Sequence, residues 1–208
     1  MKQLETILAD YVGVDFCISC ANGTDALTLA LKALGIGAGD AVFVPDFTFF
    51  SSAEVISLEG ATPIFVDVDR HTYNISVEDL NRKIEAVNRE GRLNAKCIIT
   101  VDLFGLPADY DAVRALADRF GLYIIEDAAQ GFGGCNAGRK ACSMGDICTT
   151  SFFPAKPLGC YGDGGACFTN NPEWASLIES YKGLDLSKLT YEKEGKKDSG
   201  EVELFDDE

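Results

Sequence analysis

The stretch from Ile147 to Phe168, ICTTSFFPAKPLGCYGDGGACF, joins two strand-like runs by a stiff, turn-rich loop. The apolar residues 147–153 predict one buried strand, and residues 165–169 predict a second. Lys156 lies between two prolines, which restrict the backbone on both sides and disfavour a helix at this point. The sequence therefore predicts that a lysine is held in a rigid loop just past the end of a buried strand.

Lys156 needs an explanation because lysine side chains usually occupy flexible, solvated surfaces. One explanation is a Schiff-base lysine, which needs apolar surroundings that lower its pKa and expose a neutral amine. The other is an ordinary surface lysine in an ordinary loop. The rest of the chain has to decide between these two interpretations.

Short apolar runs alternate with amphipathic segments along the chain. The apolar runs predict seven strands, at residues 16–20, 41–44, 63–68, 97–103, 122–125, 147–153 and 165–169. The amphipathic segments predict helices at residues 2–11, 24–34, 49–58, 76–84 and 109–120. This alternation is typical of a three-layer α/β sandwich with a mainly parallel sheet of about seven strands. No helix separates the last two strands, which leaves room for one antiparallel strand.

Composition and charge limit the classes of protein that fit. A chain of 208 residues with 47% hydrophobic residues can bury the core of one domain, here residues 1–184. Residues 185–208 are charged and poor in apolar residues, so we expect a disordered or poorly packed acidic tail. The formal net charge of −15 argues against a nucleic-acid or anionic-membrane partner. No apolar stretch is long enough to span a membrane and no signal peptide is evident, so the expected location is cytoplasmic.

The eight cysteines do not form the pattern of a disulfide framework or a metal site. Most of them lie inside apolar strand-like runs, where cysteine behaves as a small hydrophobic residue. Cys17 and Cys20 form one C-x-x-C pair, but no second pair follows at zinc-site spacing, and His71 is the only histidine. We therefore expect no metal.

Residues that follow the predicted strands are the candidates for ligand binding, because ligands of open α/β sheets gather at the carboxyl ends of the strands. Gly23 and Thr24 follow the first strand at a helix start, where backbone amides could cradle a phosphate. The same Asn-Gly-Thr sequence is also an ordinary helix cap. Phe49 lies in the aromatic run PDFTFF after the second strand, and it could cover a planar ring or pack in the core.

Two later strand ends carry the remaining candidates. Asp127 and Gln130 follow the fifth strand, and a buried carboxylate there needs a partner such as a protonated pyridine nitrogen, a backbone cap or an arginine. Ser151 and Lys156 follow the sixth strand. Together these positions supply the phosphate cradle, ring-stacking aromatic, pyridinium carboxylate and Schiff-base lysine that a pyridoxal 5'-phosphate site requires.

Five motifs, in the same order, resemble the DegT/StrS-type sugar aminotransferases: CANGTDAL, PDFTFFSSAEVI, GATPIFVDVD, EDAAQGFGG and SFFPAKPLGCYGDGGA. The resemblance covers about residues 1–180 and implies the large domain of a fold-type-I pyridoxal phosphate enzyme. It implies that Lys156 is the internal-aldimine lysine and that Asp127 pairs with the pyridine nitrogen. Gln130 would lie beside the cofactor hydroxyl, and Phe49 would stack on the ring. Three residues would bind the phosphate: Gly23, Thr24 and Ser151.

The resemblance also implies a reaction. Dehydratases of the family carry histidine in place of the lysine, so Lys156 favours transamination. The combination of CISCANGTDAL with SFFPAKPLGCYGDGGA is most similar to the aminotransferases that act on UDP-2-acetamido-2-deoxy-3-oxo-glucuronate. Those enzymes use glutamate as amino donor and make acetamido-sugars for surface polysaccharide, including lipopolysaccharide. The 4-keto-sugar aminotransferases share most of these motifs and are the alternative substrate class.

The chain departs from the family in its length. Family members run to nearly twice this length, so the chain looks truncated at both ends, and the family's C-terminal small domain has no counterpart here. Family active sites lie between two subunits, which implies a homodimer. The second functional hypothesis is a truncated, non-catalytic fragment that binds pyridoxal phosphate at most.

Overall fold

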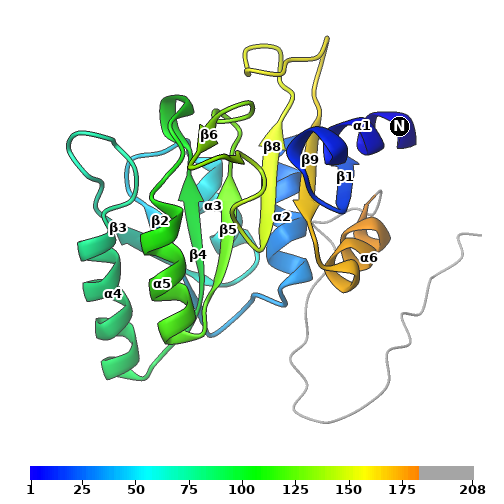
Figure 1. Cartoon of the computed structure of the whole chain (residues 1–208). Coiled ribbons are helices and arrows are strands. Elements are labelled where there is room, and N and C mark those ends of the chain that lie inside the picture. The colour runs from blue at the N-terminus through cyan, green and yellow to red at the C-terminus, as the bar shows by residue number, and fades with distance from the viewer. Residues whose placement is uncertain (183–208) are drawn as a thin grey trace, which may run out of the picture.

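A seven-stranded sheet forms the middle layer of the computed structural model, which describes residues 1–182 (Figure 1). Its strand order is β1-β9-β8-β5-β4-β2-β3. The strands are β1 (Phe16–Cys20), β2 (Asp40–Pro45), β3 (Thr62–Val66), β4 (Asn94–Val101), β5 (Tyr123–Asp127), β8 (Ile147–Ser151) and β9 (Gly165–Thr169). Within the described residues, six strands run in one direction and β9 is antiparallel to both of its neighbours, β8 and β1. The predicted mainly parallel sheet is confirmed.

Helices cover both faces of the sheet, which confirms the three-layer sandwich. One face is covered by α1 (Lys2–Val12), α4 (Val77–Glu90) and α5 (Tyr110–Phe120). The other face is covered by α2 (Gly23–Ala33), α3 (Ser51–Leu58) and α6 (Pro172–Tyr181). We refer to these as the α1/α4/α5 face and the α2/α3 face.

Strand β5 shows how one strand serves both cores. Side chains alternate between the two faces of a strand, so Ile124 packs in the core under the α1/α4/α5 face and Ile125 in the core under the α2/α3 face. Both side chains are fully buried, and each contributes about 2 kcal/mol of hydrophobic stabilisation. The same alternation continues into the two acidic residues that end the strand.

Local caps set the helix ends that position the candidate site. The Asn22 side chain accepts a hydrogen bond from the backbone N–H of Asp25 (2.8 Å) and so starts α2 directly after β1. Asp109 caps α5 in the same way by accepting from Ala112 N (3.1 Å). Gly121 ends α5 with a positive φ of 68°, a conformation that glycine adopts without strain.

Some boundaries differ from the prediction. Strand β8 ends at Ser151, two residues earlier than predicted, because Phe152 N donates to Gly164 O and begins a folded loop. Strand β4 ends at Val101 and is followed by the 3-10 turn η1 (Leu103–Gly105). Three elements of the structure were not predicted: helix α6 and the two strands of a small hairpin, β6 (Cys135–Asn136) and β7 (Arg139–Lys140). The predicted tail at 185–208 lies outside the described residues.

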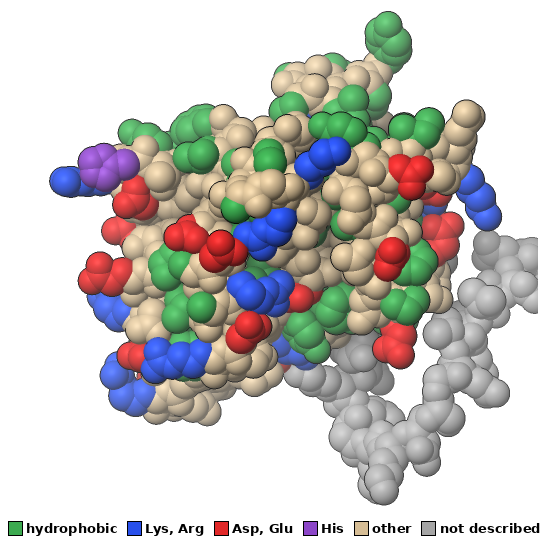
Figure 2. All heavy atoms as spheres, in the orientation of Figure 1, with side chains coloured by type: hydrophobic (Ala, Val, Ile, Leu, Met, Phe, Trp, Pro, Cys, Tyr) green, Lys and Arg blue, Asp and Glu red, His purple; other side chains and the backbone are tan. Residues whose placement is uncertain are grey.

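The surface of the described residues carries both acidic and basic side chains. Figure 2 shows acidic and basic side chains interspersed over the face that α4 and α5 form, and hydrophobic side chains along the edge where the strands end. None of the helices within residues 1–182 is long and apolar enough to cross a membrane. In the same part of the chain, no group of three or more His, Cys, Asp or Glu side chains could hold a metal ion. All eight cysteines are free thiols.

Candidate functional site

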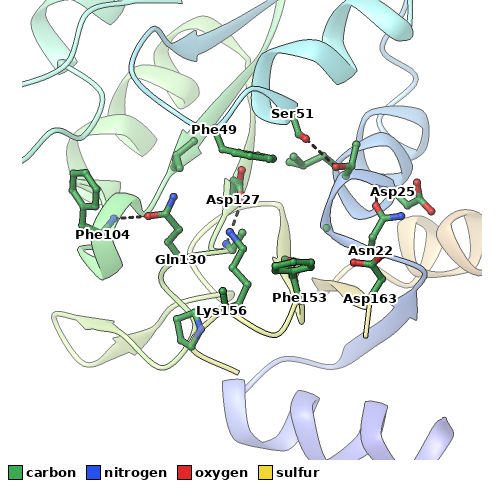
Figure 3. Close-up of a pocket in the computed structure, with 18 residues that line it drawn as sticks. Asn22, Asp25, Phe49, Ser51, Phe104, Asp127, Gln130, Phe153, Lys156 and Asp163 are labelled. Atoms are coloured by element: carbon green, nitrogen blue, oxygen red, sulfur yellow. Dashed lines mark hydrogen bonds between the residues drawn. The ribbon is translucent and has the colours of Figure 1, made fainter. Parts of the chain in front are cut away.

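A cavity of about 970 Å³ lies at the carboxyl ends of the strands, between the start of α2 and the loop that joins β8 to β9 (Figure 3). The structure brings together at this cavity all seven residues predicted for the site: Gly23, Thr24, Phe49, Asp127, Gln130, Ser151 and Lys156. They come from four separate segments of the chain, which lie at or just after the ends of β1, β2, β5 and β8. The sheet topology therefore brings the predicted residues together at the carboxyl ends of the strands, where open α/β sheets bind their ligands.

Lys156 enters the cavity from the β8–β9 loop. Its backbone N–H donates to Phe153 O (2.8 Å), which folds the loop into a tight turn. The turn is closely packed, because a Cβ on Gly159 would lie 2.5 Å from Pro154 O. The half-buried Lys156 side chain extends from this turn toward Phe49, and its Nζ lies 5.7 Å from the centroid of that ring. A restrained backbone thus presents one amine beside one aromatic ring.

Asp127 is the buried carboxylate of the cavity. Its Oδ1 accepts from Ala129 N (3.1 Å), and its Oδ2 accepts from Ser52 Oγ (2.9 Å). Burial raises the pKa of this carboxyl, while these two donors and the charge of Lys156 lower it. A carboxylate with two neutral donors and little water favours a cationic partner on the cavity side.

The start of α2 forms the opposite end of the cavity. Thr24 Oγ1 and Ser51 Oγ lie 2.9 Å apart, so two hydroxyls meet beside the first amides of the helix, those of Gly23 and Thr24, which have no acceptor within the helix. A Cβ on Gly23 would lie 2.7 Å from Ser151 Cβ, so only glycine lets this strand end approach the helix so closely. Free amides, hydroxyls and a helix N-terminus favour an anion such as phosphate.

Gln130 and Phe49 also line the cavity, with Gln130 on the side of Lys156 that lies away from the start of α2 (Figure 3). Gln130 Oε1 accepts from Phe104 N (3.0 Å), which leaves its amide nitrogen available to the cavity. Phe49 is 63% exposed and so is not a core residue, although core packing was the ordinary alternative for it. Its ring is open to a planar ligand, as the ring-stacking role requires.

Several lining or supporting residues were missed by the sequence analysis. Asp25, Ser51, Phe153 and Asp163 line the cavity, and Ser52 contacts Asp127 from outside it. The serines stand in the run TFFSSAEVI, where a hydroxyl pair at a helix start reads as ordinary capping. The sequence feature that could have identified Ser51 and Ser52 is their position directly after an aromatic run that follows a predicted strand.

The residues fit pyridoxal phosphate, because the cavity joins an anion-binding helix start, an open aromatic ring, an amine and a buried carboxylate. Fold and site together define the fold-type-I aminotransferase class. The family model of the DegT/DnrJ/EryC1/StrS aminotransferase family matches residues 1–200, and the chain belongs to this family. The aminotransferases of this family depend on pyridoxal phosphate.

Three known proteins illustrate the similarity. The UDP-2-acetamido-2-deoxy-3-oxo-D-glucuronate aminotransferase of Pseudomonas aeruginosa is 49% identical over 178 residues, which are 86% of this chain and 48% of that protein. A DegT/DnrJ/EryC1/StrS aminotransferase structure from Brucella abortus is 55% identical with a TM-score of 0.85, covering 86% of this chain and 48% of that one. The Bacillus subtilis protein NtdA with bound cofactor PMP is 33% identical with a TM-score of 0.76, covering 89% of this chain and 40% of that one. The chain spans about half the length of the curated relatives it matches.

Proposed function

We propose that this chain provides the cofactor-binding part of a sugar aminotransferase. The amino group would pass from glutamate to a nucleotide-linked keto-sugar, a UDP-3-keto-acetamido-hexuronate, for surface polysaccharide such as lipopolysaccharide. The observation that carries the proposal is the placement of Lys156, Asp127 and Phe49 around one cavity whose far end is a helix N-terminus. The 3-oxo-glucuronate aminotransferase among the relatives supports the choice of sugar. The 4-keto-sugar aminotransferases remain the alternative class.

Pyridoxal phosphate supplies an aldehyde that links to amines and a ring that takes up the electrons released when a substrate carbon loses its proton. Lys156 would hold the cofactor covalently in the resting protein. The Nζ of Lys156 would also be the base that takes a proton from the Cα of the amino donor. The tight turn at Phe153 keeps this amine near the ring that Phe49 covers.

The other residues would bind and orient the cofactor. Asp127 would hold the proton on the pyridine nitrogen, which its buried negative charge stabilises. Gln130, fixed by the Phe104 amide, would direct its NH₂ group to the cofactor hydroxyl. The phosphate would be bound by three residues at the α2 end: Gly23, Thr24 and Ser151.

The same proposal assigns residues 1–184 to the cofactor-binding domain and residues 185–208 to an acidic tail. It includes a homodimer, because family active sites lie between subunits. It also includes a cytoplasmic location. Large aromatic side chains stand exposed near the cavity mouth, and a second subunit would cover them: Phe47, Phe49, Phe50, Phe104 and Phe153.

A spectral titration tests the proposal. Adding pyridoxal phosphate should give a visible absorbance band, and borohydride should then fix the cofactor to Lys156, as peptide mass spectrometry would detect. Lys156→Ala should give no fixed adduct. A wild-type chain with neither the band nor the adduct would overturn the proposal.

A second addition separates the two functional hypotheses. Glutamate should convert the bound cofactor to its amino form and remove the visible band. A chain that forms the lysine adduct but gives no change with glutamate would be the non-catalytic, cofactor-binding alternative. Size-exclusion chromatography with light scattering would test the homodimer.

A further inference from the structure

Ser52 supports Asp127 from outside the cavity. Its Oγ lies 2.9 Å from Asp127 Oδ2 and 3.2 Å from Thr48 Oγ1. Ser52 is only 1% exposed and is not among the residues that line the cavity. Any effect of Ser52 on a bound ligand must therefore pass through Asp127.

The direction of the hydrogen bonds follows from the charge of the carboxylate. An ionised carboxylate can only accept, so the one hydroxyl proton of Ser52 has to point to Asp127. The Ser52 oxygen is then free to accept, and Thr48 can donate to it. The result is a chain of donors, Thr48 to Ser52 to Asp127, that ends on the carboxylate.

The first turn of α3 contacts both ends of the cavity through adjacent hydroxyls. Ser51 Oγ lies 2.9 Å from Thr24 Oγ1 at the anion-binding end, whereas Ser52 Oγ reaches Asp127 at the carboxylate end. The two serines are neighbours in sequence but serve different parts of the site. Ser51 is therefore a matched control for Ser52.

We propose that Ser52, oriented by Thr48, is a positioning residue that stabilises the charged form of Asp127 and fixes its carboxylate toward the cavity. This inference rests on the proposed function, in which Asp127 pairs with a protonated pyridine nitrogen. A hydrogen bond to a charged group is stronger than one between neutral groups, so a buried carboxylate gains most from such a donor. Without Ser52, Oδ2 would be buried with no donor among residues 1–182, which the structure describes.

The charges around Asp127 do not replace this donor. Burial raises the pKa of Asp127, and the Ala129 amide, the Ser52 hydroxyl and the Lys156 cation lower it, in that order. The charged forms of Asp102 and Cys142 would also interact with Asp127, but burial raises the pKa of each, so both favour the neutral form. Ser52 is therefore one of two direct donors that keep the charge on Asp127.

The test measures the Asp127 carboxyl in the protein without cofactor. Carbon-13 NMR of aspartate-labelled protein would follow its titration, with Asp127→Asn identifying the resonance. Ser52→Ala should raise the pKa of Asp127 by about one to two units, the effect of losing one hydrogen bond to a charged group. Ser52→Thr should restore the wild-type value, and Thr48→Val should give a smaller shift in the same direction. Ser51→Ala should leave the pKa of Asp127 unchanged.

Cofactor binding provides a second, independent readout. Ser52→Ala should weaken the affinity for pyridoxal phosphate about tenfold, with the loss growing as the pH is lowered, because the carboxyl is then protonated more readily. Ser51→Ala should weaken the affinity by a factor that does not change with pH.

The possible failures can be distinguished. If the wild-type chain does not bind pyridoxal phosphate, the proposed function fails, and the NMR titration still tests whether Ser52 stabilises the charge. If the wild type binds cofactor but Ser52→Ala leaves the pKa of Asp127 unchanged, the inference is wrong and the proposed function stands. Should Ser52→Ala not fold, Thr48→Val decides, and no shift in that variant would overturn the inference.

Discussion

The end of β5 places two adjacent buried carboxylates on opposite faces of the sheet, and their surroundings differ. Glu126, on the α1/α4/α5 face, accepts from three backbone amides of the segment before β8: Cys142 N (2.5 Å), Met144 N (2.7 Å) and Gly145 N (3.1 Å). Asp127, on the α2/α3 face, has one amide and one hydroxyl donor and lines the cavity. Glu126 is saturated by its own chain, whereas Asp127 retains acceptor capacity for a ligand.

This difference separates a carboxylate that holds the fold from one that is available for chemistry. Burial raises the pKa of both groups. For Glu126 the groups that lower the pKa against this effect are the three amides and the Cys148 side chain, all of which belong to the protein. A raised pKa alone therefore does not identify the functional residue. Asp127 is identified instead by the acceptor capacity that its carboxylate retains toward the cavity.

The largest expected effect is on stability at Glu126. Glu126→Ala should lower the free energy of unfolding by about 3 kcal/mol, because it leaves the buried amides of Cys142 and Met144 without an acceptor and leaves Gly145 N with only the Cys148 sulfur (3.3 Å). Urea denaturation followed by circular dichroism would measure the change. The segment has little room to adjust, since a Cβ on Gly145 would lie 2.9 Å from Glu126 N.

Asp118 offers a control for this experiment, because it is an exposed acidic residue on α5. Asp118→Ala should change the free energy of unfolding by less than about 0.5 kcal/mol. A loss below about 1 kcal/mol for Glu126→Ala would show that Glu126 does not hold the fold and would remove the contrast with Asp127.

Asp127→Asn should give the opposite pattern. The free energy of unfolding should change by less than about 1 kcal/mol, because the amide oxygen can still accept from Ala129 N and the isosteric side chain fills the same space. The affinity for pyridoxal phosphate should fall about 100-fold, since a buried cation would lose its charged partner. Fluorescence titration with the cofactor would measure this, and an unchanged affinity would contradict the role assigned to Asp127.

Most of the fold follows from local patterns in the sequence. Apolar runs such as FCISC in β1 and the strand–helix alternation were sufficient to predict a mainly parallel sandwich. The short hairpin at β6–β7 was missed because strands of two residues carry no periodicity. Helix α6 was not predicted, although its start carries a clear signal: Asn171, which accepts from Trp174 N, stands before a proline at the first helical position.

The site was predictable where one residue has a distinctive local setting. Lys156 between two prolines and Asp127 at a strand end stand out in sequence, whereas Ser52 does not. Its contact with Asp127 joins residues 75 positions apart and depends on how α3 packs beside β5. Tertiary packing decides which of two adjacent serines faces which end of the cavity, and sequence pattern carries no information on that choice.

Asp102 extends the comparison to a third carboxylate and should give the smallest effect. It follows β4, its Oδ1 accepts from Tyr110 Oη (2.8 Å) and Ala108 N (3.2 Å), and its buried Oδ2 has no hydrogen-bond partner among the described residues. Burial, and then the charge of Glu126, raise the pKa of Asp102 well above its ordinary value. Unlike Glu126 it is not saturated, and unlike Asp127 it does not line the cavity.

The sign of the pH dependence follows from this raised pKa. Above about pH 4 the unfolded chain releases the Asp102 proton while the folded protein still holds it, so stability falls as the pH rises through that window. Asp102→Asn keeps the acceptor for Tyr110 and cannot ionise in either the folded or the unfolded chain. It should therefore raise the free energy of unfolding by about 1 kcal/mol at pH 7 to 8, and the gain should vanish near pH 4. Urea denaturation at both pH values would measure it, and a variant less stable than the wild type at pH 8 would mean that the charge on Asp102 supports the fold as Glu126 does.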